Sequence, residues 1–151
     1  MSIEDRLADL GIGLPPVAKP VAAYVPAIQV GDQISTSGQL PLVSGSLPMT
    51  GLVGDQISQG DAAGQARVAA LNALAAAADV AGGVNNIRRV VRVVVYVAST
   101  ADFTAQPAVA NGASELFGEI FGDAGRHIRS AIGVASLPLG APVKVELTVQ
   151  V

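Results

Sequence analysis

The sequence predicts a single α+β domain in which two long helices cover one face of a β-sheet. Three observations indicate this fold class: a β-branched run over residues 87–98, a strictly alternating segment over residues 143–151, and only two long segments with helical spacing of apolar residues. The predicted order of elements is ββαβαββ. The 151 residues, 50% of them hydrophobic, suit one domain with a sizeable core.

Residues 1–20 are predicted to be an N-terminal extension that contains one short helix. Ser2 and Asp5 can cap a helix that runs to about Leu10, and the glycines and prolines of residues 11–16 would end it. We expect this extension to lie at the periphery of one domain that spans the whole chain.

A β-hairpin and a long loop are expected next. Two short strands over residues 25–30 and 33–37 are joined at Gly31-Asp32, a dipeptide suited to the positive φ values of a tight turn. Residues 38–60 are rich in Gly, Pro and Ser, which predicts a loop with at most one short strand. A loop of this length in a compact domain is often functional.

The first long helix is predicted from about Ala62 to Val80, with Asp61 as its N-cap. Its polar residues Gln65, Asn72 and Asp79 recur every seven positions, so we expect them on the side that faces away from the core. The inner side then carries small and apolar residues, namely Val68, Leu71, Leu74, Ala75 and Ala78.

The second half of the chain supplies the remaining helix and strands. The run over 87–98 scarcely alternates, so we expect this strand to be buried on both faces. The second long helix begins near Pro107 and ends at Gly122, and strands over 128–136 and 143–151 follow. With both helices on one face of the sheet, the other face would expose apolar surface, which predicts burial against further copies of the chain.

Composition argues against several classes of function. A formal net charge of -3 and 3% aromatic residues are unlike a nucleic-acid-binding surface. With no cysteine and one histidine, the chain can form no disulfide, thiolate site or multi-histidine metal site, and we expect no metal. Gly11-Ile12-Gly13 leads into two prolines instead of a helix, so no nucleotide cofactor is expected. The absence of cysteine favours a reducing cytoplasm. The first residues do not read as a signal peptide and no membrane span is apparent, so we expect no membrane partner.

Arg129 is the first candidate site residue. Its neighbours on the same side of the predicted strand, Ala131, Gly133 and Ala135, are small and would leave room for a ligand. Guanidinium binds a carboxylate through two parallel, charge-assisted hydrogen bonds. In the alternative interpretation, the small residues only allow close helix packing, and Arg129 reaches solvent or pairs with a glutamate.

Glu146 is the second candidate. If the last strand lay beside the strand of Arg129, the carboxylate and the guanidinium could converge on one pocket, because adjacent strands are only about 4.8 Å apart. A carboxylate there could hold or activate a water molecule. The alternative is a solvated strand face that Glu146 shares with Lys144.

Residues around the hairpin are candidates for the rim of a pocket. Tyr24 precedes the first strand, and Ser37-Gly38 closes the hairpin and opens the long loop. A tyrosine can cover an apolar ligand and still offer a hydroxyl, and Gly38 would let the main chain approach a ligand. An ordinary turn beside a partly buried tyrosine would explain the same residues.

His127 would share the side of Arg129, two residues before it, and we expect it to form hydrogen bonds at the surface or at an interface. Asn111 and Ser114 lie on the second long helix. The segment 112–116 lacks the second glycine of a nucleophile elbow, so serine hydrolase chemistry is poorly supported.

A family likeness rests on several segments that occur in one order. They are Tyr24, the segment Thr36-Ser37-Gly38-Gln39-Leu40-Pro41, Asn111, Arg129-Ser130, Leu137-Pro138 and Val143-Lys144-Val145-Glu146. On these residues the chain resembles the RidA family, also called the YjgF family, over roughly residues 21–151. The extension over 4–16 and the stretch over 125–130 are similar to a longer branch of that family.

The resemblance implies a chorismate-mutase-like fold, a homotrimer with active sites in clefts between subunits, and cofactor-free hydrolysis of 2-imino or enamino acids to 2-ketoacids and ammonia. Arg129 matches the family's carboxylate-binding arginine, and Glu146 matches its water-positioning glutamate. Four further residues match positions that line the family's pocket, namely Tyr24, Ser37, Gly38 and Asn111. Where the family usually has Cys or Thr, this chain has Ala131, so only the backbone of that residue could contribute.

Two other functions stay open at this point. One is a non-catalytic module that binds or senses small carboxylates through Arg129. The other is an endoribonuclease or translation inhibitor, against which the acidic balance and the scarcity of aromatic residues argue.

Overall fold

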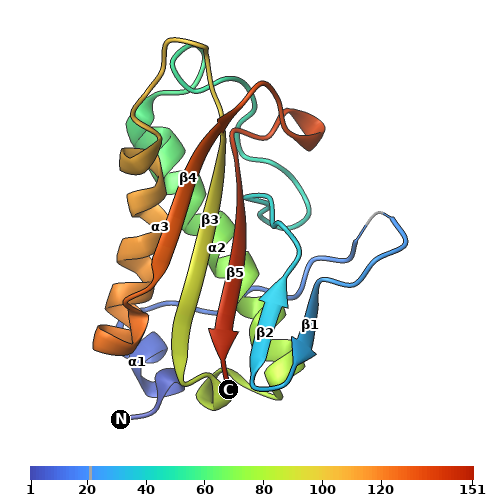
Figure 1. Ribbon diagram of the computed structural model, residues 1–151, viewed down its shortest axis with the longest axis vertical. Coiled ribbons are helices and arrows are strands. Elements are labelled where there is room, and N and C mark those ends of the chain that lie inside the picture. The colour runs from blue at the N-terminus through green and yellow to red at the C-terminus, as the bar shows by residue number, and fades with distance from the viewer. Residues whose placement is uncertain (21) are drawn as a thin grey trace.

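The computed structural model describes residues 1–20 and 22–151 and places five strands in one mixed sheet (Figure 1). Val21, where the family likeness begins, lies outside the described residues. The strands lie in the order β1-β2-β5-β3-β4, with β3 and β4 parallel and the other neighbours antiparallel. Their bounds are β1 Ala27–Val30, β2 Gln33–Thr36, β3 Arg89–Ala98, β4 Ile128–Val134 and β5 Val143–Gln150.

Helices α2 (Gln59–Ala81) and α3 (Gln106–Phe121) lie side by side on one face of the sheet (Figure 1). The short helix α1 (Ile3–Asp9) packs against α3 and the 3-10 turn η1 (Val84–Asn86). Two more 3-10 turns, η2 (Gly122–Gly125) and η3 (Pro138–Gly140), flank β4. The predicted α+β class, the order of elements and the placement of both long helices are therefore confirmed. None of the described helices is long and apolar enough to cross a membrane.

The N-terminal helix α1 is stabilised by a reciprocal pair of capping hydrogen bonds at its first turn. The Oγ of Ser2 accepts a hydrogen bond from the Asp5 main-chain N–H at 3.0 Å, and Asp5 Oδ2 accepts one from the Ser2 N–H at 3.1 Å. These hydrogen bonds from Ser2 lower the pKa of the Asp5 carboxyl. The predicted helix is confirmed, and its cap is the pair that the sequence indicated.

Helix α2 begins three residues earlier than predicted. Its N-cap is Ser58, whose Oγ accepts a hydrogen bond from the Asp61 N–H at 3.1 Å, so Asp61 lies in the first turn and is not the cap. A carboxylate in the first turn still stabilises the helix, because it faces the positive end of the helix dipole. The helix ends at Gly82, which adopts a left-handed conformation with φ of 80°.

The polar stripe predicted for the outer side of α2 is wrong for two of its three members. Asp79 is exposed, but Gln65 and Asn72 are buried. The Nδ2 of Asn72 donates to the carbonyls of Leu40 and Leu42, both at 3.0 Å. A long irregular loop that crosses a helix needs donors for its main-chain carbonyls, and Asn72 supplies them. Asn72 is therefore polar because it anchors the long loop, whereas Oε1 of the buried Gln65 has no hydrogen-bond partner among the described residues.

Alanine and glycine let the two helices approach the sheet and each other closely. The buried residues of α2 are mostly alanines, and the facing side chains of β3 and β5 are valines and one leucine with at most 1% exposure. A Cβ at Gly112 of α3 would overlap the main-chain carbonyl of Ala63 on α2. A residue with a side chain at position 112 would thus push the two helices apart.

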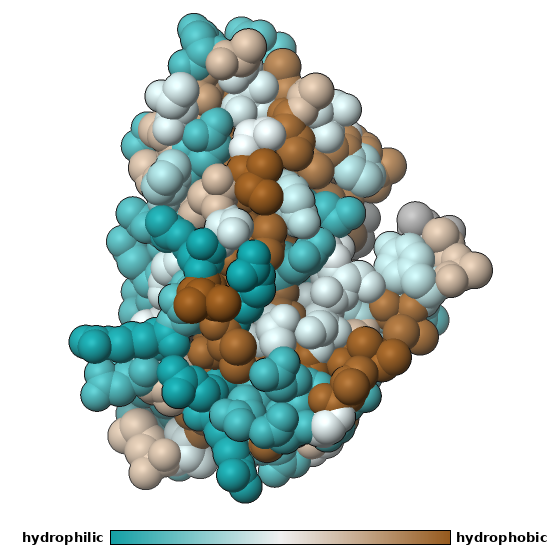
Figure 2. All heavy atoms as spheres, viewed as in Figure 1, coloured by the Kyte–Doolittle hydropathy of each residue, from teal (hydrophilic) through white to brown (hydrophobic). Residues whose placement is uncertain are grey.

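The uncovered face of the sheet is more polar in its centre than predicted. Strand β5 alternates and presents Glu146 there, and β3 presents Arg92 and Tyr96 on either side of Val94, which is 8% exposed. The expected burial of β3 on both faces is therefore seen at Val94 but not at Arg92. Exposed apolar residues gather instead on the outer strands: Ile28 and Val30 on β1, and Ile128 and Ile132 on β4. Figure 2 shows an apolar band along β4 and a second group over β1.

The role of Asn72 can be tested by replacement with leucine, which has a similar size but no donor. We expect Asn72→Leu to lower the free energy of unfolding by about 1–3 kcal/mol, because two loop carbonyls lose their partner. Chemical denaturation of both proteins measures this difference. The control is Asp79→Asn, in the same helix but exposed, for which a change within about 0.5 kcal/mol is expected. Equal losses in the two variants would contradict the anchoring role.

Candidate functional site

Arg129 lies at the edge of the sheet and reaches toward helix α3. It pairs with buried Val93 of β3, so its side chain starts on the face that the helices cover. Its Nη1 donates to Asn111 Oδ1 at 2.7 Å and to Ser114 Oγ at 3.2 Å. The guanidinium is thus tied to two residues one helical turn apart on α3.

A hollow of about 350 Å³ adjoins Arg129. It is lined by Ser114, Gly118, Gly125, Arg126, His127 and Arg129. Arg129 is half-buried there and does not pair with Glu146 or any other carboxylate among the described residues. The space is therefore open beside a guanidinium whose counter-charge is not supplied by the described chain.

The row of small residues beside Arg129 serves helix packing more than ligand binding. A Cβ at Gly133 would lie 2.8 Å from Nε2 of Gln106, so this part of the predicted trough is filled by α3. Ala131 is half-buried and packs against the hydrophobic core. The alternative interpretation of these small residues is thus correct at Gly133, and the free space lies toward Gly118 and Gly125 instead.

Glu146 lies on the opposite face of the sheet from Arg129. Strand β3 separates β4 from β5, so the two candidate strands are not neighbours and the predicted convergence within one chain is wrong. Glu146 pairs with Val94, and its Oε1 accepts a hydrogen bond from the Tyr96 hydroxyl at 3.0 Å. Burial, and then the hydrogen bond to Glu146, raise the pKa of the Tyr96 phenol. Tyr96 is therefore a protonated donor to the carboxylate at neutral pH.

The rim candidates gather at the other edge of the sheet. Tyr24 and Gly38 line a hollow of about 210 Å³ together with Lys19, Lys144 and apolar residues. A Cβ at Gly38 would overlap the Lys144 side chain, so glycine lets this side chain lie against the main chain. Ser37 donates from Oγ to the Val25 carbonyl at 2.7 Å and so holds the chain just before β1.

The candidate residues therefore form groups at opposite edges of the sheet. Arg129 and Asn111 adjoin the β4 edge, whereas Tyr24, Ser37 and Gly38 adjoin the β1–β2 edge. Strands β5 and β3 lie between β2 and β4, which corresponds to roughly 14 Å at about 4.8 Å per strand. No small ligand can touch both groups of one chain.

Sequence reasoning missed the contact between Ser114 and His127. Ser114 Oγ lies 2.9 Å from His127 Nε2, and His127 Nδ1 lies 2.7 Å from the Gly125 carbonyl oxygen. The spacing of His127 and Arg129 placed them on one side of the strand, as observed. Nothing in the sequence, however, indicated which turn of the helix would face that side.

Several arginines also gather at the start of β3 and β4. Nη2 of Arg89 donates to the Arg126 carbonyl at 3.3 Å, and both residues line a hollow of about 390 Å³ next to His127. Nη2 of Arg92 donates to Ser130 Oγ at 3.2 Å. A chain with a negative net charge thus carries a local basic surface near Arg129, which composition alone could not reveal.

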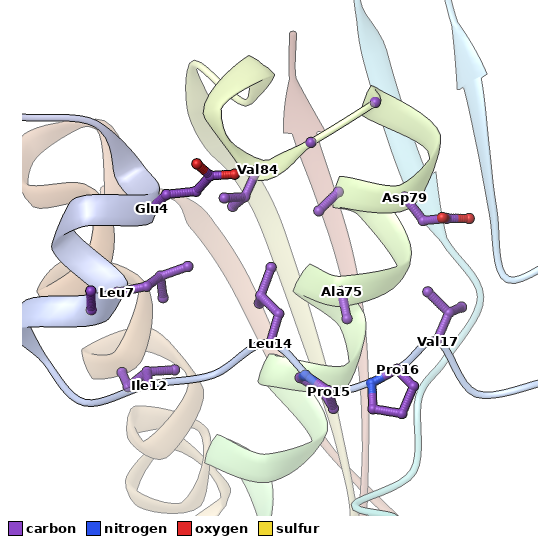
Figure 3. A pocket seen from close by; sticks show the side chains of 14 residues that line it. Glu4, Leu7, Ile12, Leu14, Pro15, Pro16, Val17, Ala75, Asp79 and Val84 are labelled. Atoms are coloured by element: carbon purple, nitrogen blue, oxygen red, sulfur yellow. The ribbon is translucent and has the colours of Figure 1, made fainter.

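A larger hollow, of about 800 Å³, lies elsewhere, between the N-terminal extension and the end of α2 (Figure 3). Its walls are mainly apolar, and its charged side chains are the carboxylates of Glu4 and Asp79. Carboxylates repel a negatively charged ligand, so this hollow does not suit the carboxylate ligand expected at Arg129. Among the described residues, no group of three or more acidic or histidine side chains could hold a metal ion.

Comparison with known proteins places the chain in a family. A family profile described as "YjgF/chorismate_mutase-like, putative endoribonuclease" matches residues 4–151. "Protein TCP17" of Trypanosoma cruzi is 40% identical over 146 residues, which cover 96% of this chain and 91% of that protein.

Solved structures agree with this placement. A protein of unknown function from Agrobacterium tumefaciens is 41% identical and superposes with a TM-score of 0.89, covering 99% of this chain and 92% of that one. A protein from Shewanella oneidensis, described as a "putative endoribonuclease", is 32% identical with a TM-score of 0.95 and full coverage of both chains. The chain belongs to the YjgF/chorismate mutase-like family, and its α+β fold is that of this family.

Proposed function

We propose that this protein hydrolyses 2-imino or enamino acids to 2-ketoacids and ammonia, with Arg129 as the anchor for the substrate carboxylate. The observation that carries this proposal is the pattern of hydrogen bonds made by the Arg129 guanidinium. Nη1 is tied to Asn111 and Ser114, whereas Nε and Nη2 have no hydrogen-bond partner among the described residues. An Nε–Nη2 edge beside a hollow suits a carboxylate with two oxygens.

The reaction needs orientation more than it needs a strong nucleophile. A protonated imine is already electrophilic, so water adds to its carbon, forming a C–O bond, and the C–N bond then breaks to release ammonia. In this scheme Glu146 holds the attacking water, accepts its proton, and returns that proton to the nitrogen, which then leaves as ammonia while the C=O bond forms. The donor Tyr96 keeps Glu146 Oε1 in place and leaves the other carboxylate oxygen for the water.

The active site would combine two subunits of a homotrimer. Arg129 and Glu146 lie on opposite faces of one sheet, and the rim residues Tyr24, Ser37 and Gly38 lie near the edge far from Arg129. A second copy could bring Glu146 and the rim of one subunit toward Arg129 of the next. The exposed apolar residues of β1 and β4 suit such an interface, since they lie on the outer strands.

Substitution of Arg129 tests the anchor. We expect Arg129→Ala to lower kcat/KM for 2-iminobutyrate by at least about tenfold to a hundredfold, since charge-assisted hydrogen bonds to the carboxylate are lost. Arg129→Lys keeps the charge but lacks the planar fork, so it should recover only part of the loss. An oxidase-coupled assay that generates the imine in situ and follows its disappearance measures both. Wild-type rates in Arg129→Ala would remove Arg129 from the reaction.

A mixing experiment tests the shared site. Arg129→Ala and Glu146→Gln are each expected to be nearly inactive alone. After the two are dissociated together and reassembled at equal amounts, about a quarter of the wild-type activity should return, because one site in four then combines an intact Arg129 with an intact Glu146. The same two variants mixed without dissociation are the control. Failure to recover activity would contradict a site built from two subunits.

RNA cleavage is a second candidate, favoured by the basic surface of Arg89, Arg92 and Arg126 near the start of β3 and β4. Polyanion binding through such a surface weakens steeply with salt. Fluorescence anisotropy of a labelled single-stranded RNA at increasing salt tests it. If the protein does not bind this RNA at low salt, RNA cleavage is rejected and imine hydrolysis is the function that remains.

A further inference from the structure

Ser114 and His127 form an oriented chain of hydrogen bonds that ends at Arg129. A guanidinium has only donors, so Ser114 Oγ accepts from Arg129 Nη1 at 3.2 Å. The hydroxyl hydrogen of Ser114 is then free to be donated to His127 Nε2 at 2.9 Å. Nδ1 of His127 faces the Gly125 carbonyl oxygen at 2.7 Å and must donate to it. In the neutral imidazole, this network places the proton on Nδ1.

The histidine ring is itself held in place. Gly125 lies at the end of η2, where a Cβ would overlap the Phe117 carbonyl, so the backbone that presents the Gly125 carbonyl packs directly on α3. The ring of Phe117, fully buried in α3, contacts the His127 ring edge to face, with centroids 6.1 Å apart and an interplanar angle of 87°. His127 is therefore fixed both by a hydrogen bond and by aromatic packing.

The same network decides which edge of Arg129 is available. Both hydrogens of Nη1 are used, one by Asn111 Oδ1 and one by Ser114 Oγ. A carboxylate can then bind only through Nε and Nη2. Without the serine, Nη1 would keep the single bond to Asn111, and the guanidinium could rotate about it. After such a rotation, the Nε–Nη2 edge of the guanidinium no longer faces the ligand.

We propose that Ser114 and His127 are positioning residues that lock the Arg129 guanidinium so that its Nε–Nη2 edge receives a carboxylate. The inference rests on the proposed function only in taking the ligand to be a small carboxylate. It assigns no covalent role to Ser114, because Oγ already accepts from a guanidinium and no helical N–H of α3 is free to stabilise an oxyanion in mid-helix.

Since His127 is the single histidine of the chain, its ring nitrogens can be observed without ambiguity in the full-length protein labelled with ¹⁵N-histidine. At about pH 8, above the usual titration range of imidazole, NMR should show one neutral tautomer with the proton on Nδ1. Addition of 2-oxobutyrate, a small carboxylate with no C–N bond to hydrolyse, should shift the Nε2 signal as Arg129 engages it. A proton on Nε2, or no response to saturating 2-oxobutyrate, would overturn the proposal.

Variants separate positioning from folding. Ser114→Ala removes the hydroxyl, Ser114→Thr retains it, and His127→Phe keeps the packing on Phe117 but removes both nitrogens. We expect the affinity for 2-oxobutyrate to fall about tenfold in Ser114→Ala and His127→Phe and to recover in Ser114→Thr. In the imine assay KM should rise by a similar factor while kcat changes less than about twofold.

The exposed Ser136 just beyond β4 supplies a matched control, because Ser136→Ala should leave affinity, KM and kcat unchanged. Thermal unfolding of each variant checks that it folds. If Ser114→Ala does not fold, the His127→Phe variant tests the positioning role in its place. Wild-type affinity in a folded Ser114→Ala or His127→Phe would overturn the positioning role. If no imine is hydrolysed but 2-oxobutyrate still binds as expected, the deaminase proposal fails and the positioning role stands.

Discussion

The close packing of helix α3 between α2 and the edge of the sheet is the constraint on which the rest of the site depends. Glycines make it possible at three points: Gly112 against the Ala63 carbonyl, Gly125 against the Phe117 carbonyl, and Gly133 against Gln106. Because main chain meets main chain at the first two points, small changes in volume there cannot be absorbed by rotating a side chain. This packing brings Asn111 and Ser114 within hydrogen-bond distance of Arg129.

The order of strands in the sheet separates the two charged candidate residues. Strand β3 lies between the strands of Arg129 and Glu146, and the alternation of side chains sends these two residues to opposite faces. A guanidinium and a carboxylate in one chain are thereby kept from neutralising each other. In the proposed scheme, each residue serves the ligand once a second chain brings the other residue to it. Catalysis and assembly are linked in this scheme by geometry alone.

Two polar residues inside the molecule, Asn72 and Tyr96, are explained by the polar groups that they contact. Asn72 is buried because the loop over 37–58, between β2 and α2, passes over α2 and needs donors. This loop begins near Gly38, at the hollow that Tyr24 also lines. Tyr96 is a donor to Glu146 for a similar reason, since a half-buried carboxylate requires a partner. In both cases the residue is polar because of what lies across from it in space.

The sequence by itself determined the class of fold, the order of its elements, the N-terminal cap at Ser2 and Asp5, and the choice of Arg129 and Glu146 as the charged residues of interest. These features depend on periodicity, capping and short motifs, which are local along the chain. Tertiary structure alone decided that Asn72 and Gln65 point inward, that β3 separates Arg129 from Glu146, and that Ser114 meets His127. Such contacts depend on strand order and on which turn of a helix faces which strand, and neither is encoded in local spacing.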